Sequence, residues 1–173
     1  SVSIADEEEA YRAVSELYRC GHRRIAALVS CAEDRSISQL RYQGYIRSLA
    51  DHGLPLEQEL VIEAGSFDIR QAYLAVRRRL MEGARFTALF AISDNMAIGA
   101  MRALREAGQQ IPRDCSVIAI DGINVSEYIH PMLTTLCQPM TAMGTKSVEL
   151  LLGVIRGGAH DHLTLPTTLR AGE

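Results

Sequence analysis

Polar residues able to hydrogen-bond a small molecule stand directly after two apolar runs of this sequence. Ser93 and Asp94 follow the run 88–92, and Asp121 follows the run 116–120. The segment between the runs has helical periodicity, so the pattern predicts two parallel strands joined by a helix. Ligands of open parallel sheets bind outside the carboxyl ends of the strands, where these side chains would gather. The unit therefore predicts a small-molecule receptor.

Two further residues add chemistry suited to a hydroxyl-rich ligand. The planar guanidinium of Arg41 can give paired hydrogen bonds to vicinal hydroxyls. Phe67 follows Gly65 at a predicted strand end, and a pyranose or nucleoside ring stacks well on such an aromatic face. The carboxylate of Asp121 would accept hydrogen bonds from ligand hydroxyls. Arg41 and Asp121 are thus expected to bracket a polyol.

Each of these residues also has a purely structural interpretation. Arg41 is equally compatible with a solvated surface arginine, and Phe67 with a core residue. Asp121 suits an Asx turn or a helix cap, and Asp94 suits the cap of a helix that begins at Asn95. The residue types alone leave these alternatives open.

The sequence contains no recognisable catalytic machinery. It has no GxSxG element, no phosphate-binding loop and no paired catalytic carboxylates. The stretch HDH at 160–162 is more typical of a hydrated loop than of a metal site. We therefore expect no enzyme activity, no metal and no cofactor. None of the four cysteines has CxxC spacing, which favours reduced thiols and a reducing compartment: Cys20, Cys31, Cys115 and Cys137.

Helical and strand periodicity alternate along almost the whole chain. Apolar spacing predicts helices over 6–19, 36–52, 68–83, 94–107 and 141–155. Apolar runs predict strands over 24–30, 60–63, 88–92, 116–120 and 133–137, with a last extended stretch at 162–169. This order predicts an α/β fold with a doubly wound, mostly parallel sheet and helices on both faces. The helix 141–155 has a broad apolar surface that should need a partner outside this chain.

Composition excludes several classes of protein. The 173 residues suffice for one core, and 47% apolar with 23% charged residues is typical of globular proteins. A net charge of -3 argues against a nucleic-acid surface within the chain. The sequence has no apolar run long enough for a membrane span and no signal-peptide pattern, so a cytoplasmic location without membrane contact is expected. Because it begins at Ser1 without Met, we expect a fragment.

Four stretches together resemble one protein family. They are GHRRIAALVS (21–30), SQLRYQGY (38–45), TALFAISDNMAIGAMRALREAGQQIPRDCSVIAIDGI (87–123) and PMLTTLCQPMTAMGTKSVELLL (131–152). In this order and spacing they are similar to the effector-binding core of lactose and galactose repressor-type (LacI/GalR) bacterial transcription regulators. The resemblance covers essentially the whole chain.

The resemblance implies a two-lobed core of the periplasmic-binding-protein type behind a small helix-turn-helix domain. In that layout residues 1–139 form the C-terminal lobe, 140–167 return to the N-terminal lobe, and 168–173 begin the final crossover. The DNA-binding domain and most of the N-terminal lobe lie outside the chain, which would explain the unpartnered apolar helix. The implied function is ligand sensing: a small molecule, a sugar or sugar derivative, binds between the lobes and modulates operator binding by the missing domain.

The resemblance also assigns roles to individual residues. Arg41 matches the effector-contacting arginine of the family's R-x-x-G-Y motif, and Asp121 matches a ligand-facing aspartate. Ser93 stands where the family often has an effector-contacting Asn, with a shorter reach, and Asp94 is a weaker candidate beside it. Gln138 and Met140 fall at the second crossover, where they would either contact ligand from behind or simply pack within the linker.

A homodimer is implied, because two recognition helices must span two half-sites. Ile98 and Met101 are expected at its interface. Two other classes remain as alternatives: a sugar-binding protein of a transport system, which would carry a signal peptide, and an enzyme built on the same sheet.

Overall fold

A six-stranded sheet forms the centre of the molecule in the computed structural model, which describes residues 1–30 and 37–172. Its strand order is β3 (Val61–Glu63), β2 (Ile25–Val29), β4 (Ala88–Ala91), β5 (Ser116–Asp121), β6 (Thr134–Cys137) and β8 (Thr168–Arg170). Every neighbouring pair from β3 to β6 is parallel, and β8 runs antiparallel to β6 at the edge. The mostly parallel sheet predicted from the sequence is confirmed.

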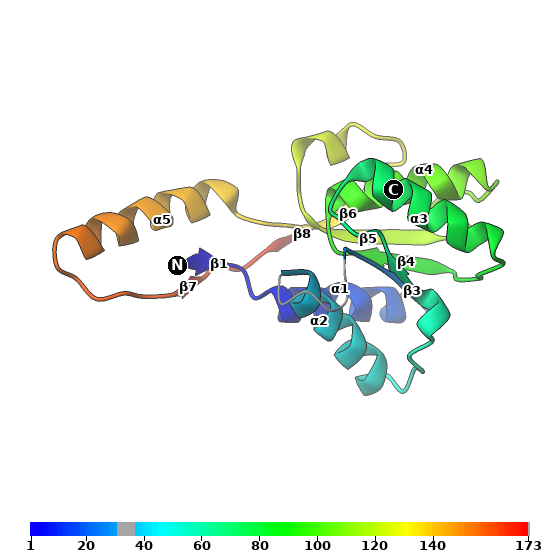
Figure 1. Cartoon of the computed structure of the whole chain (residues 1–173), viewed down its shortest axis with the longest axis horizontal. Helices are drawn as coiled ribbons and strands as arrows, with labels where there is room; N and C mark the ends of the chain where they lie inside the picture. The colour runs from blue at the N-terminus through cyan, green and yellow to red at the C-terminus, as the bar shows by residue number, and fades with distance from the viewer. Residues whose placement is uncertain (31–36, 173) are drawn as a thin grey trace.

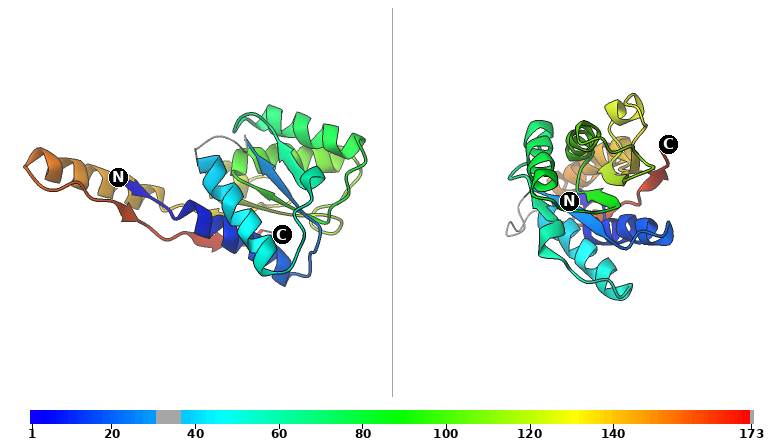
Figure 2. Two further views of the ribbon diagram at one scale, coloured as in Figure 1. Left: turned by 60° about the horizontal axis from the view of Figure 1, so that its bottom comes forward. Right: turned by 90° about the vertical axis from the view of Figure 1, so that its right-hand side faces the viewer.

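Two pairs of helices cover the two faces of this sheet (Figures 1 and 2). Helices α1 (Asp6–Arg19) and α2 (Ile37–Asp51) pack together on one face, and α3 (Ile69–Met81) and α4 (Asp94–Glu106) on the other. Short 3-10 turns η1 (Gln58–Leu60) and η2 (Asn124–Glu127) precede β3 and β6 respectively. Strands β2 and β4 are buried along their whole length, as expected for parallel strands covered on both faces.

A glycine makes the close contact within each helix pair. A Cβ atom on Gly44 of α2 would fall 2.1 Å from the carbonyl oxygen of Glu7 in α1. A Cβ atom on Gly99 of α4 would fall 2.2 Å from the carbonyl oxygen of Ile69 in α3. Because no other residue allows this approach, both helix pairs depend on these two positions.

An arm formed by residues 1–3 and 140–165 projects from this compact lobe (Figure 1). It contains β1 (Val2–Ser3), which pairs in parallel with β7 (Leu163–Thr164), and helix α5 (Met140–Ile155). No residue of α5 is buried, and most of its large apolar side chains are exposed: Met140, Val148, Leu151, Leu152 and Ile155, the last at 71%. Met143 is partly buried against the core. The expected exposed apolar surface on this helix is confirmed. No helix in the described part of the chain is both long and apolar enough to cross a membrane.

Two sequence expectations can be checked against burial. Met101 was expected at a subunit interface, but its side chain is only 2% exposed and packs in the core, so that prediction was wrong. Among the cysteines, Cys115 is buried, and this burial raises the pKa of its thiol to about 12. Cys137 is half-buried, Cys20 is exposed, and Cys31 lies outside the described residues.

Candidate functional site

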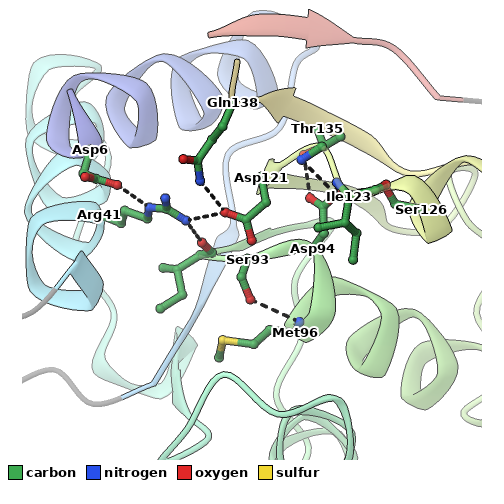
Figure 3. A network of polar contacts seen from close by, with 12 residues as sticks. Asp6, Arg41, Ser93, Asp94, Met96, Asp121, Ile123, Ser126, Thr135 and Gln138 are labelled. Carbon is green, nitrogen blue, oxygen red and sulfur yellow. Dashed lines mark hydrogen bonds and ion pairs between the residues drawn. The ribbon is translucent and has the colours of Figure 1, made fainter. Parts of the chain in front are cut away.

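The carboxyl ends of neighbouring strands bring a polar cluster together at one edge of the sheet (Figure 3). Arg41 reaches this edge from α2, Asp121 ends β5, and Gln138 follows β6. The three side chains are joined by direct hydrogen bonds. Arg41 and Gln138 lie 97 positions apart in the sequence, yet they belong to one cluster with Asp121. The reason is that the carboxyl ends of parallel strands lie side by side.

Arg41 is the centre of this cluster. Its side chain is only 3% exposed, so the solvated-arginine alternative is excluded. Its Nε donates to Asp6 Oδ1 at 2.8 Å, and its Nη1 donates to Asp121 Oδ1 at 3.2 Å and to the carbonyl oxygen of Ile92. These bonds engage the Nε and Nη1 atoms of the guanidinium. Its Nη2 has no hydrogen-bond partner among the described residues, which leaves two N–H donors for a further group.

Asp121 is held in an unusual backbone conformation. Its φ is 147°, and non-glycine residues seldom adopt such positive values. The next residue, Gly122, has φ 75°, and a Cβ atom there would lie 2.6 Å from the Cα of Cys137. The chain therefore turns sharply against β6 directly after β5. Strained positions of this kind cost about 1–3 kcal/mol and concentrate at binding sites.

The carboxylate of Asp121 is partly open, with 26% of the side chain exposed. Its Oδ1 accepts a hydrogen bond from Gln138 Nε2 at 2.8 Å in addition to the bond from Arg41. Burial raises the pKa of this carboxyl above its ordinary value, while the Arg41 charge and the bonds from Arg41 and Gln138 oppose the rise. The neighbouring Asp94 charge raises the pKa further.

Asp94 lies beneath the site and not in its open part. The carboxylate belongs to a residue with 0% exposure and accepts four hydrogen bonds. The donors are the backbone N–H groups of Gly122 (3.1 Å) and Ile123 (2.9 Å) and the hydroxyls of Ser126 (2.8 Å) and Thr135 (2.5 Å). We therefore correct the expectation that Asp94 contacts ligand: its carboxylate is fully buried, and its hydrogen bonds anchor the loop after β5.

Ser93, and not Asp94, is the cap of helix α4. Its Oγ accepts a hydrogen bond from the backbone N–H of Met96 at 3.3 Å, and α4 starts at Asp94. The helix start predicted at residue 94 is confirmed, whereas the alternative that Asp94 caps a helix beginning at Asn95 was wrong. The Ser93 side chain is 3% exposed, so it lies at the floor of this edge.

Phe67 lies in the turn between β3 and α3, at the same edge of the sheet. Its side chain is 38% exposed, which excludes the core-packing alternative. It follows Gly65, whose φ of 74° turns the chain. No hydrogen bond or ring contact joins Phe67 to the cluster around Arg41 within the described residues. Met140, at the start of α5, is 66% exposed.

The partner that sequence reasoning missed is Asp6. It is one of four consecutive acidic residues in the first turn of α1, a composition that usually indicates a solvated helix start. The only local signal was its position at the first residue of the helix. Its partner Arg41 lies 35 positions away, so only the packing of α1 against α2 reveals the pair.

Comparison with known proteins decides the family. The model of the periplasmic binding protein-like domain matches residues 14–173. The chain belongs to this family. Within it, the relatives identify the chain as a core of the LacI type. HTH-type transcriptional regulator MalR of Clostridium butyricum is 36% identical over 172 residues, covering 98% of this chain and 50% of that protein.

Other members of the family give the same result. The ribose operon repressor of Haemophilus influenzae is 34% identical, covering 90% of this chain and 46% of the repressor. Among solved structures, a transcriptional regulator CelR–cellobiose complex superposes with a TM-score of 0.92 at 32% identity, over 99% of this chain and 53% of that one. A LacI-family regulator from Sanguibacter keddieii gives a TM-score of 0.91. The chain spans about half the length of the curated relatives it matches.

Proposed function

We propose that this chain is the ligand-sensing part of a LacI-type transcription regulator, a repressor, and that it binds a sugar or sugar derivative at the edge formed by Arg41, Asp121 and Gln138. The observation that carries the proposal is the joined Arg41–Asp121 pair at the carboxyl ends of the strands. It presents donors and acceptors side by side, as a hydroxyl-rich molecule requires.

The groups left open by the cluster match a pair of hydroxyls. Arg41 Nη2 retains two donors, and Asp121 Oδ2 accepts no hydrogen bond within the described residues. A hydroxyl can accept from the first group and donate to the second. The exposed ring of Phe67 offers an apolar face for the ring of a sugar, and Ser93 supplies the floor.

The arm supports a second lobe as the other wall of the site. We assign residues 1–139 to the C-terminal lobe, 140–167 to the returning segment of the N-terminal lobe, and 168–173 to the final crossover. The exposed apolar side chains of α5 are the surface that the rest of the N-terminal lobe would cover. Ligand would then bind between two lobes, with Gln138 at the passage between them.

Ligand binding regulates the protein only through a difference in affinity between two arrangements of the lobes. Couplings of this kind are typically about 1–3 kcal/mol. We propose that operator DNA is bound by a helix-turn-helix domain outside this chain, in the cytoplasm. The CelR–cellobiose structure supports a sugar as effector, because that regulator is similar along this whole chain.

A homodimer fits this assignment. The face of α3 and the η2 turn expose large apolar side chains: Ile69 (42%), Leu74 (41%), Val125 (51%) and Tyr128 (84%). These residues replace Met101 in the proposed interface, and Ile98, which is half-buried on α4, stays a candidate. Two recognition helices need such a dimer to span two half-sites.

A sugar-binding protein of a transport system is the alternative function, since it would use the same cleft. The relatives named as transcription regulators favour the sensor. The full-length gene distinguishes the two, because the regulator requires a helix-turn-helix domain and the transport protein requires a signal peptide. We propose no catalytic role.

A thermal-shift screen of the full-length protein tests the proposal. Neutral sugars, sugar phosphates and nucleosides are compared. A ligand at about 100 times its dissociation constant should stabilise the protein by roughly 2.7 kcal/mol. Arg41→Lys keeps the charge but loses the fork, so it should abolish the shift. Arg47→Lys is the matched control, because Arg47 lies on the same helix and pairs at the surface. If no sugar gives a shift while operator binding is intact, the sugar assignment fails.

A further inference from the structure

The first turn of α1 contributes one carboxylate to the candidate site. Asp6 is 8% exposed and accepts the Nε–H of Arg41 at 2.8 Å (Figure 3). The next two acidic residues turn outward: Glu7 and Glu8 both pair with Arg47 at the surface, at 2.8 and 2.5 Å. Glu9, also buried, accepts from Thr167 and not from Arg41. Asp6 is therefore the residue of this acidic turn that pairs with Arg41 at the ligand edge, as Asp121 does.

The charges around Arg41 do not balance. Among the described residues, the guanidinium pairs with two carboxylates, those of Asp6 and Asp121, so these three groups together carry one net negative charge. The buried carboxylate of Asp94 adds a further negative charge near Asp121, although it accepts four hydrogen bonds. The open Nη2 of Arg41 therefore lies in a negative field, and this field is screened little on the side of Asp6, which is buried together with Arg41.

We propose that Asp6 is a specificity-determining residue that restricts the site to uncharged ligands. The inference rests on the proposed function, since it names the charge class of the molecule bound at that site. Asp6 compensates the charge of Arg41, so Arg41 acts as a hydrogen-bond donor to hydroxyls and not as a counter-ion. A carboxylate or phosphate at Nη2 would meet the uncompensated charge of Asp121 at close range. Sugar acids and sugar phosphates are thereby excluded.

The variant that tests this role is Asp6→Asn. The amide is nearly isosteric and its oxygen can still accept the Nε–H of Arg41, so the position of the guanidinium is kept. Only the charge is removed, which brings the sum over residues 6, 41 and 121 from -1 to zero. Glu7→Gln is the matched control, because it removes one carboxylate from the same turn at a position that is 42% exposed and pairs with Arg47.

The measurement is calorimetric titration of the full-length protein with matched pairs of probes. D-glucose is compared with D-glucuronate and D-glucose 6-phosphate, D-galactose with D-galacturonate, and cellobiose with cellobionate. For the best-binding neutral probe, wild type and Glu7→Gln should prefer it to its anionic counterpart by at least about tenfold. Asp6→Asn should reduce this preference by about tenfold, chiefly through tighter binding of the anionic probe.

Two results would overturn the inference. The first is a wild-type protein that binds an anionic probe as tightly as its neutral counterpart. The second is an Asp6→Asn protein that folds and binds the neutral probe with an unchanged preference. If Asp6→Asn does not fold, Asp6→Glu retains the charge and must retain the preference, and its loss would refute the role. If wild type binds none of the neutral probes, the proposed sugar-sensing function fails instead, which is a separate result.

Discussion

The buried carboxylate of Asp94 allows a quantitative prediction about the loop after β5. Its Oδ2 accepts from the backbone N–H groups of Gly122 and Ile123 and from the Ser126 hydroxyl, and its Oδ1 accepts from the Thr135 hydroxyl. We consider the substitution Asp94→Ala, which removes all four acceptor positions at once. The residue has 0% exposure, so water cannot replace the lost oxygens without entering the core.

The loss of stability in Asp94→Ala depends on which of the four donors can find another acceptor. The Ser126 hydroxyl already lies 2.6 Å from the carbonyl oxygen of Ile123 and can turn to it. The two backbone N–H groups cannot move in this way, and each unsatisfied buried donor costs about 1–3 kcal/mol. Asp94→Ala should therefore lower the free energy of unfolding by about 2 to 6 kcal/mol, a large share of the stability of a typical domain.

Asp94→Asn separates acceptor geometry from charge. An amide oxygen placed at the Oδ2 position keeps the three donors there, and only the Thr135 hydroxyl must reverse its bond. We expect a loss of about 1–2 kcal/mol for this variant. Asp68→Ala is the control, because Asp68 is a cap that accepts one hydrogen bond, from Gln71 at 3.0 Å, and its loss costs about 1 kcal/mol.

Urea unfolding measures the free energies, and hydrogen exchange of the Gly122 and Ile123 amides locates the effect. The expected order of destabilisation is Asp94→Ala, then Asp94→Asn and Asp68→Ala together. In Asp94→Ala the two amides should exchange faster even where global unfolding is negligible. A loss below 1 kcal/mol in Asp94→Ala, with the two amides still protected, would refute the account of Asp94 as the anchor of this loop.

Three further predictions concern the site edge and the proposed interface. Because burial raises the pKa of Asp121, the affinity for a neutral sugar, measured as a function of pH, should fall as the pH drops through that raised pKa. The effect on folding has the opposite sign: the raised pKa contributes stability at low pH, and this stability is lost as the pH rises through it. Gly122→Ala should cost more than about 3 kcal/mol in thermal unfolding, because its Cβ would lie 2.6 Å from Cys137, whereas Gly53→Ala, with nothing within 4 Å, should cost about 1 kcal/mol. Tyr128→Lys should shift the full-length protein towards monomer in light scattering without weakening sugar binding; an unchanged dimer would remove this surface from the interface.

Most of the fold was predictable because its signals are local. Helix 94–107 was predicted from periodicity and observed as Asp94–Glu106, and strand 116–120 was observed as Ser116–Asp121. The gathering of Arg41, Asp121 and Gln138 was also predictable, since it follows from strand ends and a helix start. The periodic patterns specify which residues face the sheet, and the parallel topology then places the strand ends together.

The roles of individual carboxylates were not predictable from the sequence. Ser93 and Asp94 are adjacent and both suit a helix cap, so local propensity cannot say which one caps α4. Asp94, which is not the cap, is instead buried below the ends of the strands, where it accepts hydrogen bonds from Ser126 and Thr135 of later segments. Asp6 likewise looks like a solvated helix start until α2 packs against it. Side-chain partners of this kind depend on tertiary packing, which a single sequence does not encode locally.

The same cluster connects the candidate site to the arm. The chain passes between lobe and arm at residues 4–5, 138–139 and 166–167, and a buried or partly buried polar contact lies on the lobe side of each passage. Asp6 binds Arg41 at the first and Gln138 binds Asp121 at the second, while Thr167 donates to Glu9 at 2.6 Å at the third. A molecule that binds Arg41 and Asp121 therefore touches the groups that hold two of the three passages. A ligand regulates the arm only if it binds one position of the arm more tightly than another. No chain of intermediate contacts is needed for this, because the residues that the ligand contacts also form the hydrogen bonds at two of the passages.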